Sequence, residues 1–220
     1  SLVPLLNDVK KQYEAEHAGV SLVLNTAGTQ VLKAQIEQGA PADVLISARQ
    51  KDVDDLQGKG LVESSEHLAS NEPILILSTE GARKIKTAAD LTQSGVRIVL
   101  GDESSPIGEY SRKALQKMGE PSFYEKVLKN VVSNESNEQN VLAKVVLGEA
   151  DAGMVYQTSF QEEKAKGTAI SAITIDKAQN VRSDYYLVRL KGLSSGGGEF
   201  AKWMMGDKGK ELLQKHGFLL

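Results

Sequence analysis

Several small or hydroxyl-bearing residues stand where helices are expected to begin, and these junctions are the part of the sequence best suited to binding a ligand. A helix N-terminus offers backbone N–H groups without partners inside the helix and a partial positive charge, so it attracts anions. Each junction taken alone is more typical of an ordinary helix cap, because Ser, Thr and Asn are favoured there for local hydrogen bonding. Only their convergence in space would make them a site. The junctions are Ser1, Asn25-Thr-Ala-Gly-Thr29, Gly101-Asp-Glu-Ser-Ser-Pro-Ile-Gly108, Ser136-Asn-Glu138 and Tyr156-Gln-Thr-Ser159.

Residue patterns typical of catalysis or of metal binding are missing from the sequence. His17, His67 and His216 fall at expected helix ends or in polar loops, with no second His or acid at ligand spacing, so we interpret them as surface or capping residues. No nucleophile elbow, P-loop or dinucleotide-binding glycine motif follows an expected strand. Acid pairs such as Asp54-Asp55 belong to solvated helix faces. The sequence therefore predicts a protein that is not an enzyme and has no direct cation ligands.

Composition excludes further classes of function. The 220 residues include 26 Lys and Arg against 29 Asp and Glu, a net charge of −3, and no Cys. Without Cys there is no disulfide framework, thiolate nucleophile or Cys-ligated zinc, and without a basic field no nucleic-acid partner is expected. No apolar run approaches the roughly 18 residues that cross a membrane. No signal peptide is evident, which fits either a cytosolic protein or a mature or trimmed exported one.

Strand-like apolar runs alternate with amphipathic helices along the whole chain, which predicts an α/β fold with mostly parallel sheets. Eight or nine strands over this length suit two small sheets better than one. Gly196-Gly-Gly198 is expected as a turn or short link. Strands are expected at 20–24, 43–47, 73–78, 96–100, 131–132, 152–156, 170–175 and 185–190. Helices are expected near 2–16, 31–38, 49–58, 88–91, 107–118, 123–128, 138–148, 200–205 and 208–215.

Four blocks of sequence resemble, in order, the periplasmic molybdate-binding proteins of ABC importers, which are type II periplasmic binding proteins. The resemblance covers essentially the whole chain, and its first and third blocks are long and specific. The blocks are Gln35-Ile-Glu-Gln-Gly-Ala-Pro-Ala-Asp-Val-Leu-Ile-Ser-Ala48, the loop from Gly101-Asp to Pro106-Ile-Gly-Glu-Tyr110, Gly148-Glu-Ala-Asp-Ala-Gly-Met-Val-Tyr156, and Lys215-His-Gly-Phe218.

This resemblance implies two α/β lobes, each a mostly parallel sheet flanked by helices, that close over a tetrahedral oxyanion in the cleft between them. We expect lobe 1 to comprise residues 1–80 and 184–220, and lobe 2 to be the inserted residues 81–183. The hinge is then expected near 78–81 and 180–183.

Carried over position by position, the resemblance also implies the residues that hold the anion. Ser1 and Thr29 match hydroxyl residues that open the first two helices, and Tyr156 matches a tyrosine whose hydroxyl contacts the anion. Ile107 and Glu138 match positions that donate a backbone N–H.

Two departures from the family pattern stand out. Family members have a strand just before the position of Ser1, so we expect the given chain to be trimmed there. Glu138 replaces a residue that is usually apolar, and its carboxylate would repel an anion. We therefore expect its side chain to point out of the site and only its N–H to point in.

The resemblance implies a receptor that captures molybdate, and also tungstate, and delivers it to the membrane subunits of an ABC permease. It would carry no cofactor, act as a monomer, and be periplasmic or a lipoprotein on the outer face of the membrane. One alternative is a receptor for another oxyanion such as sulfate. A second is the oxyanion-sensing effector domain of a transcription regulator, which needs a DNA-binding domain before residue 1. A third is an enzyme on the same scaffold.

Overall fold

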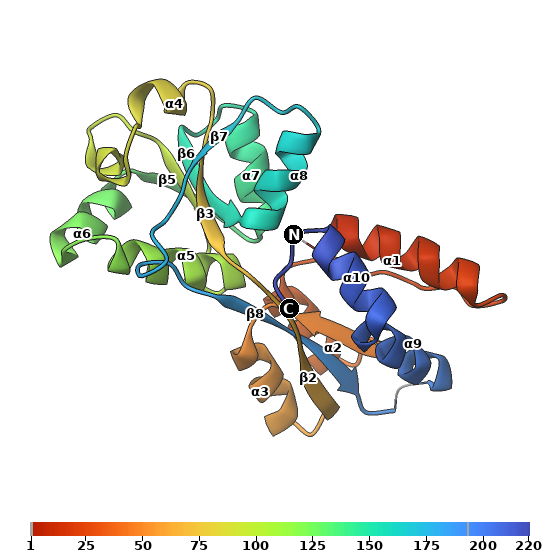
Figure 1. The fold of residues 1–220 in the computed structure, drawn as a ribbon. Helices are drawn as coiled ribbons and strands as arrows, with labels where there is room; N and C mark the ends of the chain where they lie inside the picture. The colour runs from red at the N-terminus through yellow and green to blue at the C-terminus, as the bar shows by residue number, and fades with distance from the viewer. Residues whose placement is uncertain (1, 193) are drawn as a thin grey trace. The chain divides into compact units, whose positions relative to one another are not determined.

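The computed structural model describes residues 2–192 and 194–220, and the chain divides into two compact units. Unit 1 comprises Ser1–Asn71 and Asp184–Leu220, and unit 2 comprises Glu72–Ser183. Each unit combines its own β-sheet with flanking helices (Figure 1), which confirms the α/β class.

Unit 1 is built on a three-stranded sheet of order β1-β8-β2, in which β1 and β8 pair antiparallel. Along β8, Tyr185 and Leu187 join one buried cluster and Val188 and Leu190 join another. This alternation places hydrophobic clusters on both faces of the sheet. The strands are β1 (Val44–Ser47), β2 (Val62–Asn71) and β8 (Ser183–Leu190). The helices are α1 (Val3–Glu16), α2 (Thr29–Glu37), α3 (Gln50–Gly58), α9 (Ser195–Met205) and α10 (Asp207–Lys215).

Unit 2 is built on a five-stranded sheet of order β5-β4-β6-β3-β7. The sheet is mixed, because β4 runs parallel to β5 and β6 whereas β3 runs antiparallel to β6 and β7. The strands are β3 (Pro73–Leu77), β4 (Ile98–Gly101), β5 (Val131–Glu135), β6 (Ala152–Tyr156) and β7 (Ser171–Ile173). The helices are α4 (Gly81–Lys84), the 3-10 helix η1 (Ala88–Thr92), α5 (Pro106–Lys117), α6 (Pro121–Lys129), α7 (Glu138–Val146) and α8 (Gln157–Ala165).

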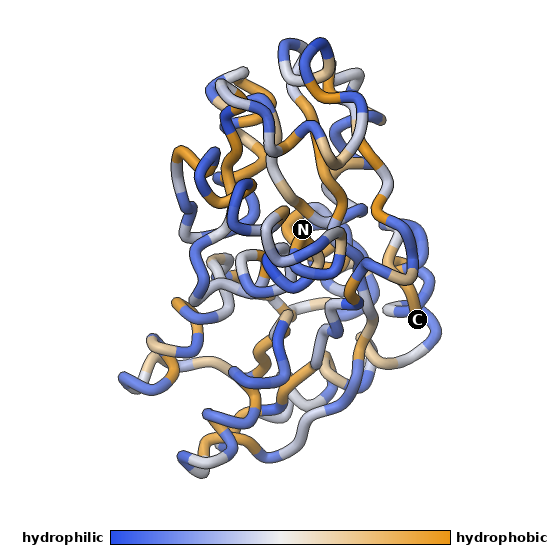
Figure 2. The backbone as a smooth tube through the Cα atoms, turned by 90° about the vertical axis from the view of Figure 1, so that its left-hand side faces the viewer, coloured by the Kyte–Doolittle hydropathy of each residue, from blue (hydrophilic) through white to orange (hydrophobic). Residues whose placement is uncertain are grey.

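Both faces of the unit 2 sheet are buried, which explains its continuous apolar strands. In β3, Leu75 and Leu77 pack into one cluster with Leu115 of α5. Ile74 and Ile76 pack into the cluster on the other face, against α7. Hydrophobic and hydrophilic stretches alternate along the backbone tube (Figure 2).

The division between the units differs from the one expected after residue 80. β3 pairs with β6 and β7, so it belongs to unit 2 rather than to the first lobe. The expected hinge at 78–81 also lies inside unit 2, where Ser78 accepts a hydrogen bond from the N–H of Gly81 at 3.0 Å. The chain passes between the units at Asn71–Glu72 and at Ser183–Asp184.

The expected strand at residues 20–24 is wrong. Within the described residues, this segment forms no strand, and the side chain of Val23 is 94% exposed. Leu22 is fixed instead by α1, because its N–H donates to the Glu14 carboxylate at 2.7 Å.

The expected turn at residues 196–198 is also wrong, because these glycines form the first turn of α9. Ser194 caps this helix and its side chain accepts from the N–H of Gly197 at 3.0 Å. A Cβ on Gly197 would lie 2.4 Å from the Cβ of Asp43, so the glycine permits a close approach between α9 and the segment before β1.

A buried carboxylate ties together the start of β6, the start of β4 and α4. Asp151 is fully buried and accepts from Lys84 Nζ at 3.0 Å and from the Arg97 backbone N–H at 2.9 Å. Burial raises the pKa of this carboxyl, but the hydrogen bonds from Arg97 and Lys84 outweigh burial and leave the pKa below its usual value.

Asp151→Asn is expected to lower the free energy of unfolding by about 1–3 kcal/mol at neutral pH, because charge-assisted hydrogen bonds are lost. A carboxyl whose pKa is depressed in the folded state stabilises the fold at pH values above its unfolded-state pKa of about 3.9. This stabilisation is lost as the pH falls through the folded-state pKa. Urea unfolding at a series of pH values should therefore show the two proteins converging below about pH 4. Asp54→Asn, at a surface contact with Gln50, serves as control. A difference that stays constant down to pH 2 would contradict this role.

Candidate functional site

The N-termini of α5, α7 and α8 follow the carboxyl ends of β4, β5 and β6 in the unit 2 sheet. β4, β5 and β6 run parallel, so their carboxyl ends share an edge. α5 follows β4 and α7 follows β5 after short connections, and α8 begins directly after the last residue of β6. This edge is where ligands bind in open α/β sheets, and a helix N-terminus attracts an anion.

Ile107 lies in the first turn of α5, directly after Pro106. Ser105 caps the helix: its side chain accepts from the N–H of Gly108 at 3.1 Å and donates to the carbonyl of Asp102 at 2.7 Å. The Ile107 side chain is 2% exposed, which fixes the orientation of its backbone. Its N–H has no carbonyl partner within the helix and can be donated to a ligand.

Glu138 is the first residue of α7, and its side chain lies within unit 2. The residue is only 7% exposed, and its Oε1 accepts from the backbone N–H of Tyr156 at 3.1 Å. The neighbouring cap is made by Asn137, whose side chain accepts from the N–H of Asn140 at 3.0 Å. The carboxylate therefore folds into unit 2 against β6 instead of turning toward solvent, because it satisfies a buried backbone donor.

Tyr156 ends β6 and precedes the first residue of α8. It is 3% exposed, and its hydroxyl lies 3.2 Å from Oγ of Ser183, which is fully buried. The structure thus links two predicted site residues, Glu138 and Tyr156, and adds Ser183 to them. From the sequence, Ser183 was expected only as part of the hinge, because a lone serine before a strand carries no signal of this contact.

In unit 1, Thr29 is the first residue of α2 and is 6% exposed. Its hydroxyl oxygen accepts from the N–H of Ala48 at 3.3 Å, which holds the helix start against the end of β1. Ser1 lies outside the residues that the structure describes.

A buried cation that the sequence analysis missed follows directly after Ala48. Arg49 is 8% exposed and donates to both carboxylate oxygens of Asp52, at 2.9 and 2.8 Å. Lys33 Nζ also lies 3.6 Å from Oδ1 of the Asp52 carboxylate. The positive charges of Arg49 and Lys33 are therefore matched within unit 1 by carboxylates.

The histidines take structural positions. His17 and His216 follow the last residues of α1 and α10. His17 Nδ1 lies 2.8 Å from the carbonyl of Tyr13, and His216 Nε2 lies 3.0 Å from the Asp8 carboxylate. His67 lies on β2, with Nε2 3.3 Å from the Asp184 carboxylate.

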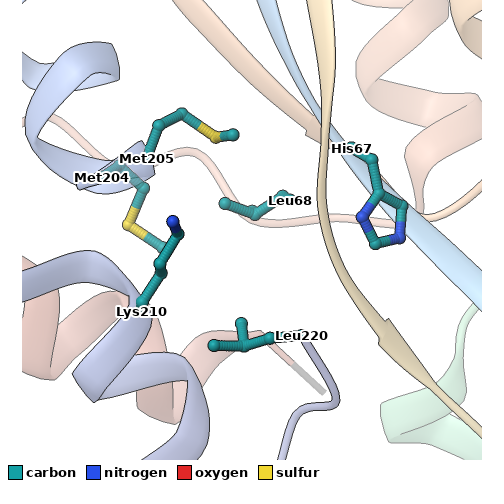
Figure 3. A pocket seen from close by; sticks show the side chains of 6 residues that line it. All are labelled: His67, Leu68, Met204, Met205, Lys210 and Leu220. Carbon is teal, nitrogen blue, oxygen red and sulfur yellow. The ribbon is translucent and has the colours of Figure 1, made fainter. Parts of the chain in front are cut away.

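Unit 1 also contains a cavity of about 290 Å³, which differs in character from the edge of the unit 2 sheet (Figure 3). Its lining is mostly apolar, and none of the four predicted residues that the structure describes takes part in it. No hydroxyl side chain belongs to this lining, so the cavity differs from the junctions considered above. The residues that line it are His67, Leu68, Met204, Met205, Lys210 and Leu220.

The described residues contain neither a cluster of metal ligands nor a helix suited to crossing a membrane. Among residues 2–192 and 194–220, no three His, Cys, Asp or Glu side chains are grouped so that they could hold a metal ion. Within the same ranges, no helix has the length and apolar character needed to cross a membrane.

Comparison with protein families gives one match that spans the chain. Residues 1–219 match the model described as bacterial extracellular solute-binding protein. The chain is 28% identical to the molybdate-binding protein ModA of Mycobacterium tuberculosis, over 99% of this chain and 81% of that protein.

Solved structures agree with this match. The substrate binding domain of a putative molybdenum ABC transporter from Clostridium difficile is 25% identical, with a TM-score of 0.71 over 99% of this chain and 94% of that one. The periplasmic molybdate-binding protein of Azotobacter vinelandii shares the fold, with a TM-score of 0.85 at 20% identity over 100% of this chain and 95% of that one.

Proposed function

The chain belongs to the bacterial extracellular solute-binding proteins, and from this membership we propose that it captures molybdate, and also tungstate, and delivers it to an ABC permease. This is a family of binding proteins, and we propose that the chain performs no catalysis, carries no cofactor and acts as a monomer outside the cytoplasm. The relatives named for molybdate binding support this ligand.

The observation that carries the proposal is the shared edge of β4, β5 and β6. It brings the N-terminus of α5 with Ile107, the N-terminus of α7 with Glu138, and Tyr156 to one side of unit 2. We propose that these three supply donors to the anion from unit 2 and that Ser1 and Thr29 supply hydroxyls from unit 1. Contacts from both units make a closed form bind more tightly than an open one, so the ligand shifts the equilibrium toward closure. The bends would fall at the crossings Asn71–Glu72 and Ser183–Asp184.

Selectivity follows from the type of hydrogen bond and from size. A site made of donors suits a fully deprotonated dianion. A hydrogen phosphate would leave its own O–H without an acceptor, at a cost of about 1–3 kcal/mol. Sulfate has the same charge as molybdate but is smaller, so it reaches fewer donors at once.

Calorimetric titration of the protein with molybdate, tungstate, sulfate and phosphate tests the proposal. We expect molybdate and tungstate to bind with similar affinities and both other anions to bind at least about 100-fold more weakly, which corresponds to 2.7 kcal/mol. Tight binding of phosphate without binding of molybdate would contradict the proposal, and preference for sulfate would favour the alternative receptor.

Glu138→Gln is expected to strengthen molybdate binding by about tenfold. The amide oxygen of Gln retains the hydrogen bond from the Tyr156 N–H, whereas the negative charge disappears. Repulsion between a carboxylate and a nearby dianion in a hydrated site is worth about 1–2 kcal/mol. Glu149→Gln, just beyond the far end of α7, makes the same change in net charge and should leave the affinity unchanged. Equal or weaker binding by the Glu138 variant would mean that this carboxylate does not face the anion.

A further inference from the structure

A second hydroxyl stands behind the one proposed to contact the anion. Ser183 is fully buried, and its Oγ lies 3.2 Å from the hydroxyl of Tyr156, which is itself 3% exposed. A phenol has one proton to donate and an oxygen that also accepts. If Tyr156 gives its proton to an anion, its bond with Ser183 persists only with Ser183 as the donor.

The contact with Tyr156 involves a residue at the very end of unit 2. Ser183 is the last residue of unit 2 and the first residue of β8, so it lies at the point where the chain leaves unit 2. The other crossing is tied to the same place, because the carbonyl of Glu72 accepts from the N–H of Gln157 at 2.9 Å. Asn180 joins the two crossing segments by donating to the carbonyl of Pro73 at 3.0 Å. The junction that carries Tyr156 is thus bonded to both ends of unit 2.

We propose that Ser183 is a positioning residue of the oxyanion site, whose hydroxyl donates to Tyr156 and directs the phenolic proton toward the bound anion. The inference rests on the proposed function. The proposed hydrogen bonds run from Ser183 to Tyr156 and from Tyr156 to the anion. Each hydrogen bond polarises the next, so the Tyr156 hydroxyl becomes a stronger donor to the anion. The same series of hydrogen bonds connects the occupied site to the segment where the polypeptide leaves unit 2.

A double-mutant cycle on molybdate affinity separates this role from a merely structural one. Ser183→Ala is expected to weaken molybdate binding by about five- to tenfold. In the background of Tyr156→Phe the same change should have less than about a twofold effect, because the proton that Ser183 directs is absent. Ser111→Ala is the matched control, since Ser111 is fully buried in α5 and its Oγ has no hydrogen-bond partner among the described residues. It should bind molybdate like the wild type.

Calorimetry measures all five proteins, and thermal unfolding confirms that each is folded. If Ser183→Ala does not fold, Ser183→Cys, which fills the site with a weak donor, takes its place in the cycle. An unchanged affinity on removing the hydroxyl, or an equal loss with and without the Tyr156 hydroxyl, overturns the role of Ser183 while leaving the receptor intact. A wild-type protein that binds neither molybdate nor tungstate overturns the proposed function, and this inference with it.

Discussion

Tyr156→Phe is expected to weaken molybdate binding by about 10–100-fold while the protein stays folded. A hydrogen bond from a neutral donor to a charged acceptor is worth about 1.5–3 kcal/mol, and each 1.4 kcal/mol is a factor of ten in affinity. The aromatic ring, which is 3% exposed, remains in place to fill the end of β6. The loss of the bond to Ser183 should lower the free energy of unfolding by no more than about 1.5 kcal/mol.

Calorimetric titration with molybdate measures this effect, and urea unfolding measures the stability. Tyr124→Phe is the matched control, because Tyr124 lies on α6 and packs against the cluster of Leu115 and Val127. Its affinity should equal that of the wild type. If Tyr156→Phe also binds with unchanged affinity, the Tyr156 hydroxyl is not part of the site.

Gly108→Ala is expected to reduce molybdate affinity by more than about 100-fold and the free energy of unfolding by about 1–3 kcal/mol. Gly108 lies in the first turn of α5, and a Cβ there would be 1.9 Å from the carbonyl oxygen of Asp102 and 2.6 Å from that of Gly101. Both neighbours are backbone atoms, so the loop or the helix must move as a whole. Either movement turns the N–H of Ile107 away from the edge of the sheet.

The control for this substitution is Gly58→Ala at the end of α3, where a Cβ would meet no atom of the described residues within 4 Å. This variant should bind molybdate normally and unfold within about 0.5 kcal/mol of the wild type. If Gly108→Ala binds as tightly as the wild type, the N-terminus of α5 does not contact the anion.

Most elements of unit 2 could be predicted from the sequence because their signals are local, but α4 (Gly81–Lys84) and α8 (Gln157–Ala165) were not among the expected helices. A strand such as 73–77 is apolar at every position, since both faces of its sheet are buried. Unit 1 was harder to predict. β2 begins with the polar run Val62-Glu-Ser-Ser-Glu-His67, which shows no strand periodicity, and it was missed. Residues 20–24 have the composition of a strand, but the N–H of Leu22 donates to the side chain of Glu14 on α1.

The candidate site stays a prediction, but the sheet of unit 2 gives a physical reason why three of its junctions share one side. Parallel strands must end at one edge, so Ile107 and Glu138, which follow β4 and β5, and Tyr156, which ends β6, are brought to the same side. The directions of the side chains could not be predicted. The carboxylate of Glu138 turns toward the Tyr156 N–H, and Ser183 meets the Tyr156 hydroxyl, only because distant segments pack together.

A crystal structure of the protein with tungstate tests the central claim most directly, because the anomalous scattering of tungsten locates the anion without ambiguity. We predict a single strong peak whose oxygen atoms lie about 2.7–3.2 Å from the backbone nitrogens of Ile107 and Glu138 and from the hydroxyls of Thr29 and Tyr156. A peak elsewhere, or an anion held by Lys and Arg side chains away from the shared edge of β4, β5 and β6, would contradict the account.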